Sequence, residues 1–191
     1  MQEYIKKGVA ILNQGGIILF PTDTAFGIGC RMDNEAAIKR LFGIRNRPET
    51  QATPVLVSSK EMAAEYLLAI PEAVEEKLIQ RFWPGALTIV LPARTEKIPE
   101  LVRGGRDTLG VRMPNHPIAL EIISQVGVPI LGPSANFHGD KTPFSFEELD
   151  PELVRLVDYV VSGECVSKQV STVIDCSVNP WKILRQGAIT L

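Results

Sequence analysis

The apolar positions of the chain change between helical and extended spacing many times along its length. Residues 3–13 carry apolar side chains at about the helical period, and Gly15-Gly16 follows as a stop before the continuous apolar run 17–20. This pattern predicts a helix, a turn and a buried strand. Pro21 then ends the strand, and the polar loop Thr22-Asp23-Thr24 follows it.

The same alternation continues to the end of the chain. Asn34 is placed to cap a helix whose apolar face begins at Ala37. Further helices are predicted over 60–69, behind Ser58-Ser59, over 71–81 and over 117–126, with short helical stretches at 146–149 and 151–156. Strands are predicted over 54–57, 86–91, 108–112, 128–131, 159–161, 172–174 and 182–184. Alternating strands and helices without a repeat or linker predict an α/β fold. We expect one domain, residues 1–191, around a twisted and mostly mixed sheet with flanking helices.

Composition narrows the class of protein without naming a function. The 191 residues are 45% hydrophobic and 22% charged, which is typical of a globular protein. A formal net charge of -2 excludes a uniformly basic protein that coats nucleic acid, so any anion site must be local. Cys30, Cys165 and Cys176 are widely spaced, which favours a reducing compartment over a disulfide framework or a zinc site. With no signal peptide and no apolar run of membrane length, we expect a cytoplasmic protein that does not enter a membrane.

Standard catalytic and phosphate-binding motifs are absent from the sequence. The segment Gly139-Asp140-Lys141-Thr142 lacks the spacing of a P-loop, and Gly27-Ile28-Gly29 lacks the third glycine of a dinucleotide fingerprint. Neither His116 nor His138 is placed with a cysteine or serine for nucleophilic catalysis. His116 is better explained as a residue at the start of a helix.

Arginines and hydroxyl residues instead gather in the loops that follow the predicted strands. They are Thr22, Thr24, Arg45, Arg47, Thr108, Arg112, Ser134, Thr142, Ser171, Thr172 and Arg185. Ligands of open α/β sheets bind outside strand ends, and the guanidinium fork suits phosphate and carboxylate. The residues alone leave two readings open at about even weight: an anionic small-molecule site, or ordinary turn formers and solvated arginines.

Seven short segments, taken in order, resemble the signature blocks of one known family. They are Gly16–Gly29, Arg45-Asn-Arg-Pro48, Trp83–Thr88, Thr108–Pro114, Gly132-Pro-Ser-Ala-Asn136, Ser171-Thr-Val-Ile174 and Leu184-Arg-Gln-Gly187. The family is that of the YrdC-like threonylcarbamoyl-AMP synthases, in its short, single-domain form. The resemblance implies an α/β domain with a large, concave, positively charged cavity. It also implies the reaction of L-threonine, bicarbonate and ATP to threonylcarbamoyl-adenylate and pyrophosphate, for threonylcarbamoyladenosine modification of tRNA.

Transferred residue by residue, the resemblance divides the polar residues between two substrates. The L-threonine and bicarbonate side is expected to hold Thr22, Arg112, Gly132, Ser171 and Thr172. The nucleotide side is expected to hold Arg45, Thr108, Ser134, Thr142 and Arg185. Positioning of the reactants is assigned to Arg45, Arg47 and Arg112, with Arg112 as the partner of the threonine carboxylate. No protein nucleophile, general base or metal ligand is expected, because the Mg²⁺ travels with ATP.

The resemblance leaves some points open. The product would pass to a separate tRNA threonylcarbamoyl-transferase complex. The alternatives are a YrdC-like module that binds tRNA or double-stranded RNA without synthase activity, and a related transferase acting on a different carbamate. Arg45 stands where many members have lysine, and the loop 49–53 is longer than usual. His138 replaces a common serine, as a tolerated exchange or as a pH-sensitive ATP contact.

Overall fold

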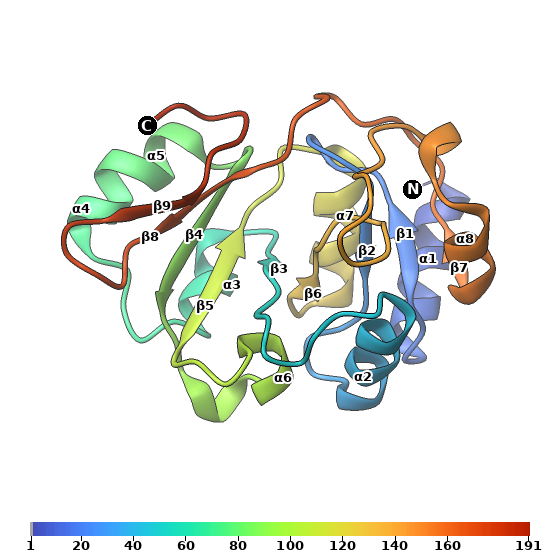
Figure 1. Ribbon diagram of the computed structural model, residues 1–191, viewed down its shortest axis with the longest axis horizontal. Coiled ribbons are helices and arrows are strands. Elements are labelled where there is room, and N and C mark those ends of the chain that lie inside the picture. The colour runs from blue at the N-terminus through green and yellow to red at the C-terminus, as the bar shows by residue number, and fades with distance from the viewer. Residues whose placement is uncertain (1) are drawn as a thin grey trace.

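Two mixed β-sheets form the centre of the structure, a computed structural model that describes residues 2–191 (Figure 1). The smaller sheet has the order β2 (Gly27–Gly29), β1 (Ile18–Phe20) and β7 (Tyr159–Val160). The larger has the order β6 (Ile130–Leu131), β3 (Val55–Leu56), β5 (Thr108–Arg112), β4 (Leu87–Pro92), β8 (Thr172–Asp175) and β9 (Lys182–Arg185). The predicted α/β class and mixed strand directions are confirmed, and the strands divide between two sheets.

Strand directions follow from the connections between the strands. The hairpin-like pairs β1–β2, β4–β5 and β8–β9 are antiparallel. The pairs β1–β7, β3–β5 and β4–β8 are parallel, and helices or long loops lie between their members in the chain. Isolated bridges from Gly27 to Ser134 and from Arg31 to Ile130 join the two sheets beside β6. The turn that begins at Gly132 is therefore fixed between the sheets.

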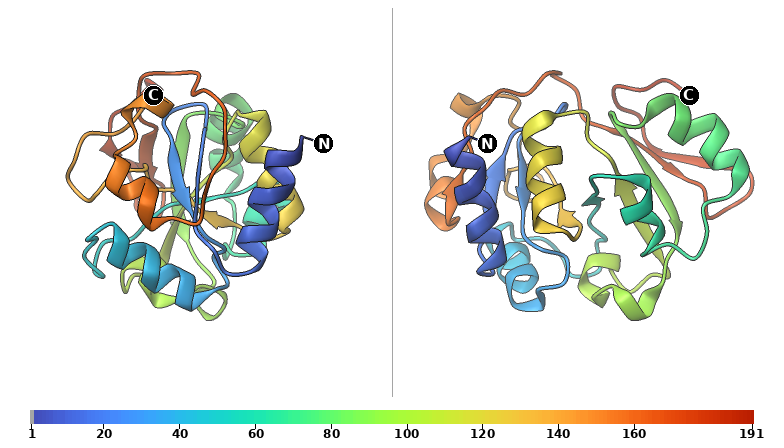
Figure 2. Two further views of the ribbon diagram at one scale, coloured as in Figure 1. Left: turned by 90° about the vertical axis from the view of Figure 1, so that its right-hand side faces the viewer. Right: turned by 180° about the vertical axis from the view of Figure 1, so that it is seen from behind.

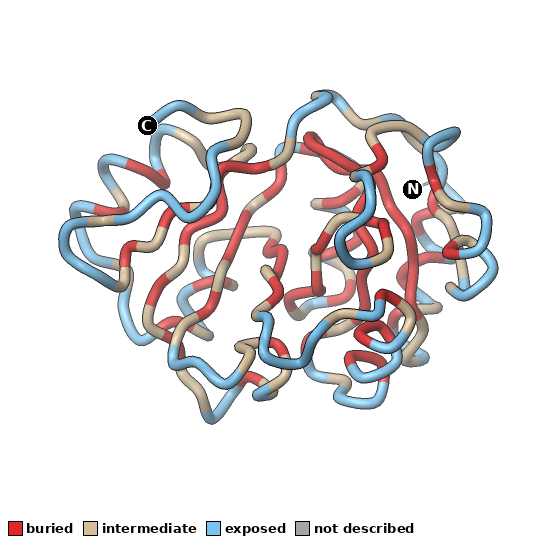
Figure 3. The backbone as a smooth tube through the Cα atoms, viewed as in Figure 1, coloured by how far each residue is buried: buried red, intermediate tan, exposed pale blue. Residues whose placement is uncertain are grey.

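Two long helices cover the back of the molecule. Figure 2 shows α1 (Glu3–Asn13) beside α7 (Pro117–Val126), and the two helices contact each other directly. Their apolar faces share one buried cluster with Leu56 and Ile130 of the larger sheet. Burial of such side chains stabilises the fold by about 25 cal/mol per Å² of apolar surface. Figure 3 shows the buried residues running through both sheets.

The other helices lie at the ends and edges of the sheets. They are α2 (Glu35–Ile44), α3 (Lys60–Ala64), α4 (Glu72–Val74), α5 (Gln80–Phe82), α6 (Glu100–Arg103) and α8 (Pro151–Leu156). A π-helical turn, Glu75–Ile79, joins α4 to α5, and 3-10 turns occupy Thr95–Lys97 and Phe146–Glu148. The predicted cap of α2 is present, since the Asn34 side chain accepts a hydrogen bond of 3.0 Å from the amide of Ala37.

Three local predictions needed correction. The helix predicted over 60–69 ends at Ala64, because residues 66–68 pair with residues 92–94 at the end of β4. Leu68 donates its amide to Pro92, and Tyr66 accepts from the amide of Arg94. Strand β2 was not predicted, since a Gly-Ile-Gly segment has little strand propensity of its own. The short helix α6 was also missed. No helix among residues 2–191 is both long enough and apolar enough to span a bilayer.

Candidate functional site

Two adjoining cavities lie where the polar loops of both sheets converge. Their volumes are about 140 and 540 Å³, and both are lined by Arg47, Pro54, Thr88 and Arg185. The smaller cavity is also lined by other predicted site residues, namely Thr22, Arg45, Arg112, Gly132, Ser134 and Ser171. The larger cavity is lined by Thr108, together with Arg106 and Asp175. Segments more than 160 residues apart in the chain thus meet around one space.

Arginines dominate the lining of the smaller cavity. Arg45, Arg47, Arg112 and Arg185 all line it, and no carboxylate of the described residues 2–191 does. Arg45 and Arg112 are buried, and a buried cation is stable only when it is paired or hydrogen-bonded. The cavity is therefore chemically suited to an anionic ligand, such as a phosphate or carboxylate group.

Arg45 is a buried cation whose hydrogen bonds are only partly satisfied. Only 3% of its surface is exposed, and its Nε donates to the carbonyl of Asn136 at 2.9 Å. Its Nη1 is buried without a hydrogen-bond partner in the described part of the chain. Burial, and next the neighbouring charge of Arg47, lower the pKa of Arg45 to about 10. Because Arg45 lines the smaller cavity, an anion bound there would stabilise its positive charge.

Arg47 holds the loop that follows it. Its Nε donates to the carbonyl of Gln51 at 3.2 Å, and its Nη2 donates to the carbonyl of Ala52. Burial lowers the pKa of Arg47 as well. The 49–53 loop therefore folds back on an arginine that also lines both cavities.

Arg112 is buried deeply, at the end of β5. Its Nε donates to the carbonyl of Gly85 at 3.0 Å, Nη1 donates to Thr24 Oγ1 at 2.8 Å, and Nη2 pairs with the carboxylate of Asp23. Burial lowers its pKa, and the charge of Asp23 and the hydrogen bond to it act in the opposite direction. The guanidinium is thus fixed on three sides.

The hydroxyl of Thr22 is fully occupied within its own loop. Its Oγ1 donates to the carbonyl of Ala25 at 2.7 Å and accepts from the amide of Thr24 at 3.1 Å. Thr24 Oγ1 lies 3.0 Å away and must be the donor of that contact, because the one hydroxyl proton of Thr22 is already used. Thr22 therefore shapes the cavity wall and holds Thr24 in place.

A second hydroxyl network involves residues from the larger sheet and the segment before β8. Thr88 Oγ1 and Ser171 Oγ are 3.0 Å apart, and both residues are buried. Arg185 Nη2 donates to the hydroxyl and the carbonyl of Ser171, at 2.9 and 2.8 Å. Strands β4, β8 and β9 thereby position one arginine at the border of the two cavities.

Gly132 is required by close packing. A Cβ atom at this position would lie 2.3 Å from Cγ of Leu56, so any larger residue would overlap the Leu56 side chain. Its amide donates to the carbonyl of Pro54, and the next carbonyl, that of Pro133, accepts from the amide of Ile28. The turn is therefore anchored to both sheets, with Ser134 facing the smaller cavity.

Two predicted residues line neither cavity. Thr172 is completely buried, and its Oγ1 donates to the carbonyl of Ile189 and accepts from the amides of Gly187 and Ile189. This hydroxyl holds the C-terminal segment. Thr142 is half-buried in the loop before Pro143. The ligand roles assigned to both threonines stay predictions.

The sequence pattern also left several contributors unassigned. Asp23, Thr88 and Asn136 hold the arginines and hydroxyls of the site, although none was predicted as a site residue. The available signal for Asp23 was the pattern Thr-Asp-Thr directly after a buried strand. The available signal for Thr88 was its place within a signature block. Nothing in the pattern indicated Asn136 as a backbone acceptor for Arg45.

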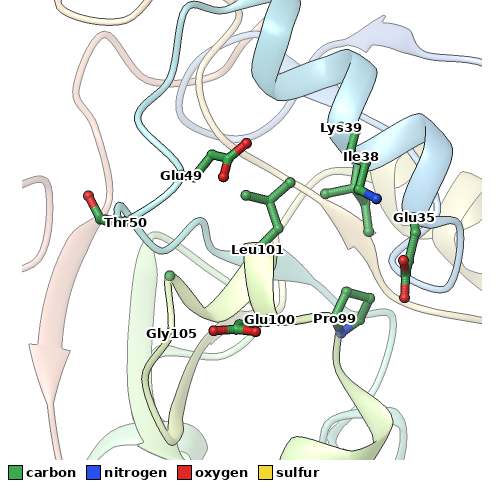
Figure 4. A pocket seen from close by; sticks show the side chains of 10 residues that line it. Glu35, Ile38, Lys39, Glu49, Thr50, Pro99, Glu100, Leu101 and Gly105 are labelled. Atoms are coloured by element: carbon green, nitrogen blue, oxygen red, sulfur yellow. The ribbon is translucent and has the colours of Figure 1, made fainter.

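A separate cavity of about 520 Å³ shares no lining residue with these two cavities (Figure 4). It is formed by α2, the segment 49–50 and α6, with Glu35, Glu49 and Glu100 on its rim. No predicted site residue lines it. Residues 2–191 contain no group of three or more His, Cys, Asp or Glu side chains that could hold a metal ion. The three cysteines are free thiols.

Comparison with known proteins identifies the family. The model of the Sua5, YciO and YrdC proteins, described as "Telomere recombination", matches residues 10–187. The chain belongs to the Sua5/YciO/YrdC family. The family resemblance and the fold predicted from the sequence segments are thereby confirmed.

Curated members of the Sua5/YciO/YrdC family include proteins named threonylcarbamoyl-AMP synthase. That of Pyrococcus abyssi is 36% identical over 188 residues, which cover 98% of this chain and 55% of the relative. That of Halorhodospira halophila is 36% identical over 159 residues, which cover 83% of this chain and 82% of the relative. A crystal structure of P. abyssi Sua5 complexed with L-threonine superposes with a TM-score of 0.88 at 36% identity, covering 96% of this chain and 54% of that one. This chain thus spans about half the length of the P. abyssi relative.

Proposed function

We propose that this chain is a threonylcarbamoyl-AMP synthase, which converts L-threonine, bicarbonate and ATP to threonylcarbamoyl-adenylate and pyrophosphate. The observation that carries the proposal is a cavity lined by Arg45, Arg47, Arg112 and Arg185 and by no carboxylate of the described residues 2–191. Such a cavity is built for anions. The curated names of the relatives and the L-threonine complex of the P. abyssi protein support the choice of substrates.

The proposed chemistry needs no protein nucleophile. The amine of threonine forms a C–N bond with the carbon of bicarbonate, and water leaves to give a carbamate. A carbamate oxygen then attacks the α-phosphorus of ATP, the bond to the β-phosphate oxygen breaks, and pyrophosphate leaves. The protein contributes by holding the reactants in line, which is worth about 7–11 kcal/mol in favourable cases, and by stabilising negative charge.

The residues divide naturally between these tasks. Arg112, fixed in the wall beside Thr22 and Gly132, is proposed to bind the threonine carboxylate. Arg45, Arg47 and Arg185 are proposed to face the phosphates, with Ser134 beside them. Thr108 and the larger cavity are proposed to take the nucleoside. Ser171, which lines the smaller cavity, is proposed to lie on the side of L-threonine and bicarbonate. Thr142 and Thr172 keep their predicted ligand roles only as proposals.

Mg²⁺ belongs to this proposal as a companion of the nucleotide. The described residues offer no cluster of three metal-ligating side chains, so no step is assigned to a protein-bound metal. On ATP, the ion would neutralise part of the phosphate charge. Transfer of the product to tRNA by a separate complex, and a cytoplasmic location, are likewise proposals.

The test is release of pyrophosphate from ATP by the purified protein, with L-threonine and bicarbonate omitted one at a time. We expect release to require both, and to be lost in Arg45→Ala but retained in Arg155→Ala, which removes an exposed arginine from α8. Absence of release, together with retained binding of tRNA or double-stranded RNA, would replace the synthase with an RNA-binding module. Release without threonine would indicate a different carbamate substrate.

A further inference from the structure

The guanidinium of Arg112 has five N–H groups, and the protein uses three of them. Nε is bound to Gly85, Nη1 to Thr24 and Nη2 to Asp23. Within residues 2–191, one N–H on each Nη nitrogen is left without an assigned acceptor. A carboxylate in the cavity can accept from this pair only while the guanidinium keeps its present orientation. The orientation therefore decides whether the site can bind its ligand by two bonds.

Asp23 is the buried ion-pair partner of Arg112. Arg112 lines the smaller cavity and so do Thr22 and Thr24, but Asp23 does not. The side chains of Arg112 and Asp23 are 7% and 9% exposed, so the pair is shielded from water. A carboxylate outside the cavity lining would act on the ligand through the arginine that it holds.

Thr24, which lines the cavity, also restrains the orientation of the Arg112 guanidinium. Its Oγ1 accepts from Arg112 and donates to Thr22, and Thr22 in turn donates to the carbonyl of Ala25. The donor of each hydrogen bond in this series is therefore fixed, because arginine can only donate and a carbonyl can only accept. The loop 22–25 thus presents a fixed acceptor to Nη1, just as Asp23 presents one to Nη2.

We propose that Asp23 is the positioning residue of the carboxylate subsite, and that with Thr24 it holds Arg112 as a two-pronged fork aimed into the cavity. This inference rests on the proposed function, since it takes the threonine carboxylate as the ligand of the fork. The role falls to a residue that does not line the cavity.

A competing effect of charge predicts the opposite change in threonine binding. The negative charge of Asp23 also offsets that of Arg112, so its removal leaves a more positive subsite that attracts a carboxylate more strongly. If charge dominated, an Asp23→Asn variant would bind threonine more tightly. If orientation dominates, the variant binds more weakly, because a neutral amide holds the buried guanidinium less firmly.

The experiment measures binding of L-threonine and, separately, of ATP to the wild type and Asp23→Asn by calorimetry. We expect the dissociation constant for threonine to rise about 10- to 100-fold, the loss typical of a charged hydrogen-bond partner, while that for ATP stays within about twofold. In turnover, KM for threonine should rise far more than kcat falls. Asp33→Asn is the matched control, because it breaks an exposed arginine–aspartate pair away from the cavity.

A second readout isolates the carboxylate. L-Threoninamide lacks the negative charge that the fork would bind, so the wild type should prefer threonine over it, and Asp23→Asn should lose most of that preference. A general structural defect would weaken the binding of threonine and of threoninamide to the same extent. As an independent variant, Thr24→Val should weaken threonine binding, whereas Thr24→Ser, which keeps the hydroxyl, should restore it. This pair carries the test if Asp23→Asn fails to fold.

Several results would overturn the inference. They are unchanged or tighter threonine binding by Asp23→Asn, an equal loss of ATP binding, an unchanged preference over threoninamide, and equal behaviour of the two Thr24 variants. A wild type that binds no threonine would overturn both this inference and the synthase. Threonine binding with the expected variant pattern but no pyrophosphate release would reject the synthase alone.

Discussion

The side chain of Arg185 donates three hydrogen bonds to Ser171. Its Nη2 donates to both the carbonyl and the hydroxyl of that residue, and its Nε donates to the same carbonyl at 3.0 Å. Since Ser171 precedes β8 and Arg185 ends β9, the antiparallel pairing of these strands sets where the guanidinium lies. The arginine is thus positioned before any ligand arrives.

This relationship predicts an effect on nucleotide binding. Arg185→Ala should raise the dissociation constant for ATP by about tenfold or more, because a charged partner of the phosphates is lost. Ser171→Ala should have a smaller effect, since the carbonyl still holds the guanidinium. Titration of ATP in the absence of threonine measures both. An unaltered ATP constant in Arg185→Ala would show that the nucleotide lies elsewhere.

The contact between Gly132 and Leu56 predicts a steric conflict that can be relieved. Gly132→Ala should lower the free energy of unfolding by about 1–3 kcal/mol, because its Cβ would overlap the Leu56 side chain. In a Leu56→Ala background, the same change should cost much less. Urea unfolding of the four proteins measures the coupling. Additive losses would indicate that the turn moves away from Leu56.

The buried His116 predicts a specific dependence of stability on pH. Its Nε2 contacts the carbonyl of Glu164 at 3.0 Å, and its Nδ1 is buried without a partner among residues 2–191. Burial lowers its pKa, although the Glu164 carbonyl and the charge of Asp23 oppose this. A depressed folded pKa means that the stabilising contribution is complete above the unfolded value of about 6.5 and is lost as pH falls through the lower folded value.

Unfolding measured from pH 7.5 to pH 5 checks this expectation. The wild type should lose stability across that range, and His116→Gln, which keeps a donor for Glu164 but cannot titrate, should lose less. Carboxylates titrate mainly below this window. Parallel curves for the two proteins would assign the pH dependence to other groups.

His138 separates the two explanations that the sequence left open. Its side chain is exposed and lines a surface hollow with Asn46 and Asp140, and it lines neither candidate cavity. Replacement of His138 by serine should therefore leave the ATP dissociation constant and its pH dependence unchanged. A shift in that pH profile between pH 6 and 8 would support the pH-sensitive contact instead.

Local rules predicted much of the fold, because they depend on neighbours in the chain. The Asn34 cap, the start of α7 at Pro117 and the buried strand before Pro21 all follow from short-range chemistry. Strand β2 escaped prediction because its pairing with β1 and with Ser134 comes from tertiary structure.

The candidate site was predictable in its residue types and not in its bonds. Most predicted arginines and hydroxyls line the two cavities, since loops after strands converge. The pairing of Arg112 with Asp23 spans 89 residues, and no pattern in the sequence specifies it. Likewise, only the folded C-terminal segment shows that the hydroxyl of Thr172 serves Ile189.

Strand β9 is expected to be the least stable strand that contributes to the site. It pairs on one side only within residues 2–191, and each of its four residues is exposed, yet it carries Arg185 to the cavity. Edge segments with few buried contacts open by sub-global fluctuations far more often than a protein unfolds. Its amides should exchange with deuterated water much faster than those of β4. Occupation of the cavity by a nucleotide, by holding Arg185 in place, should slow that exchange and make the ligand part of what keeps the strand closed.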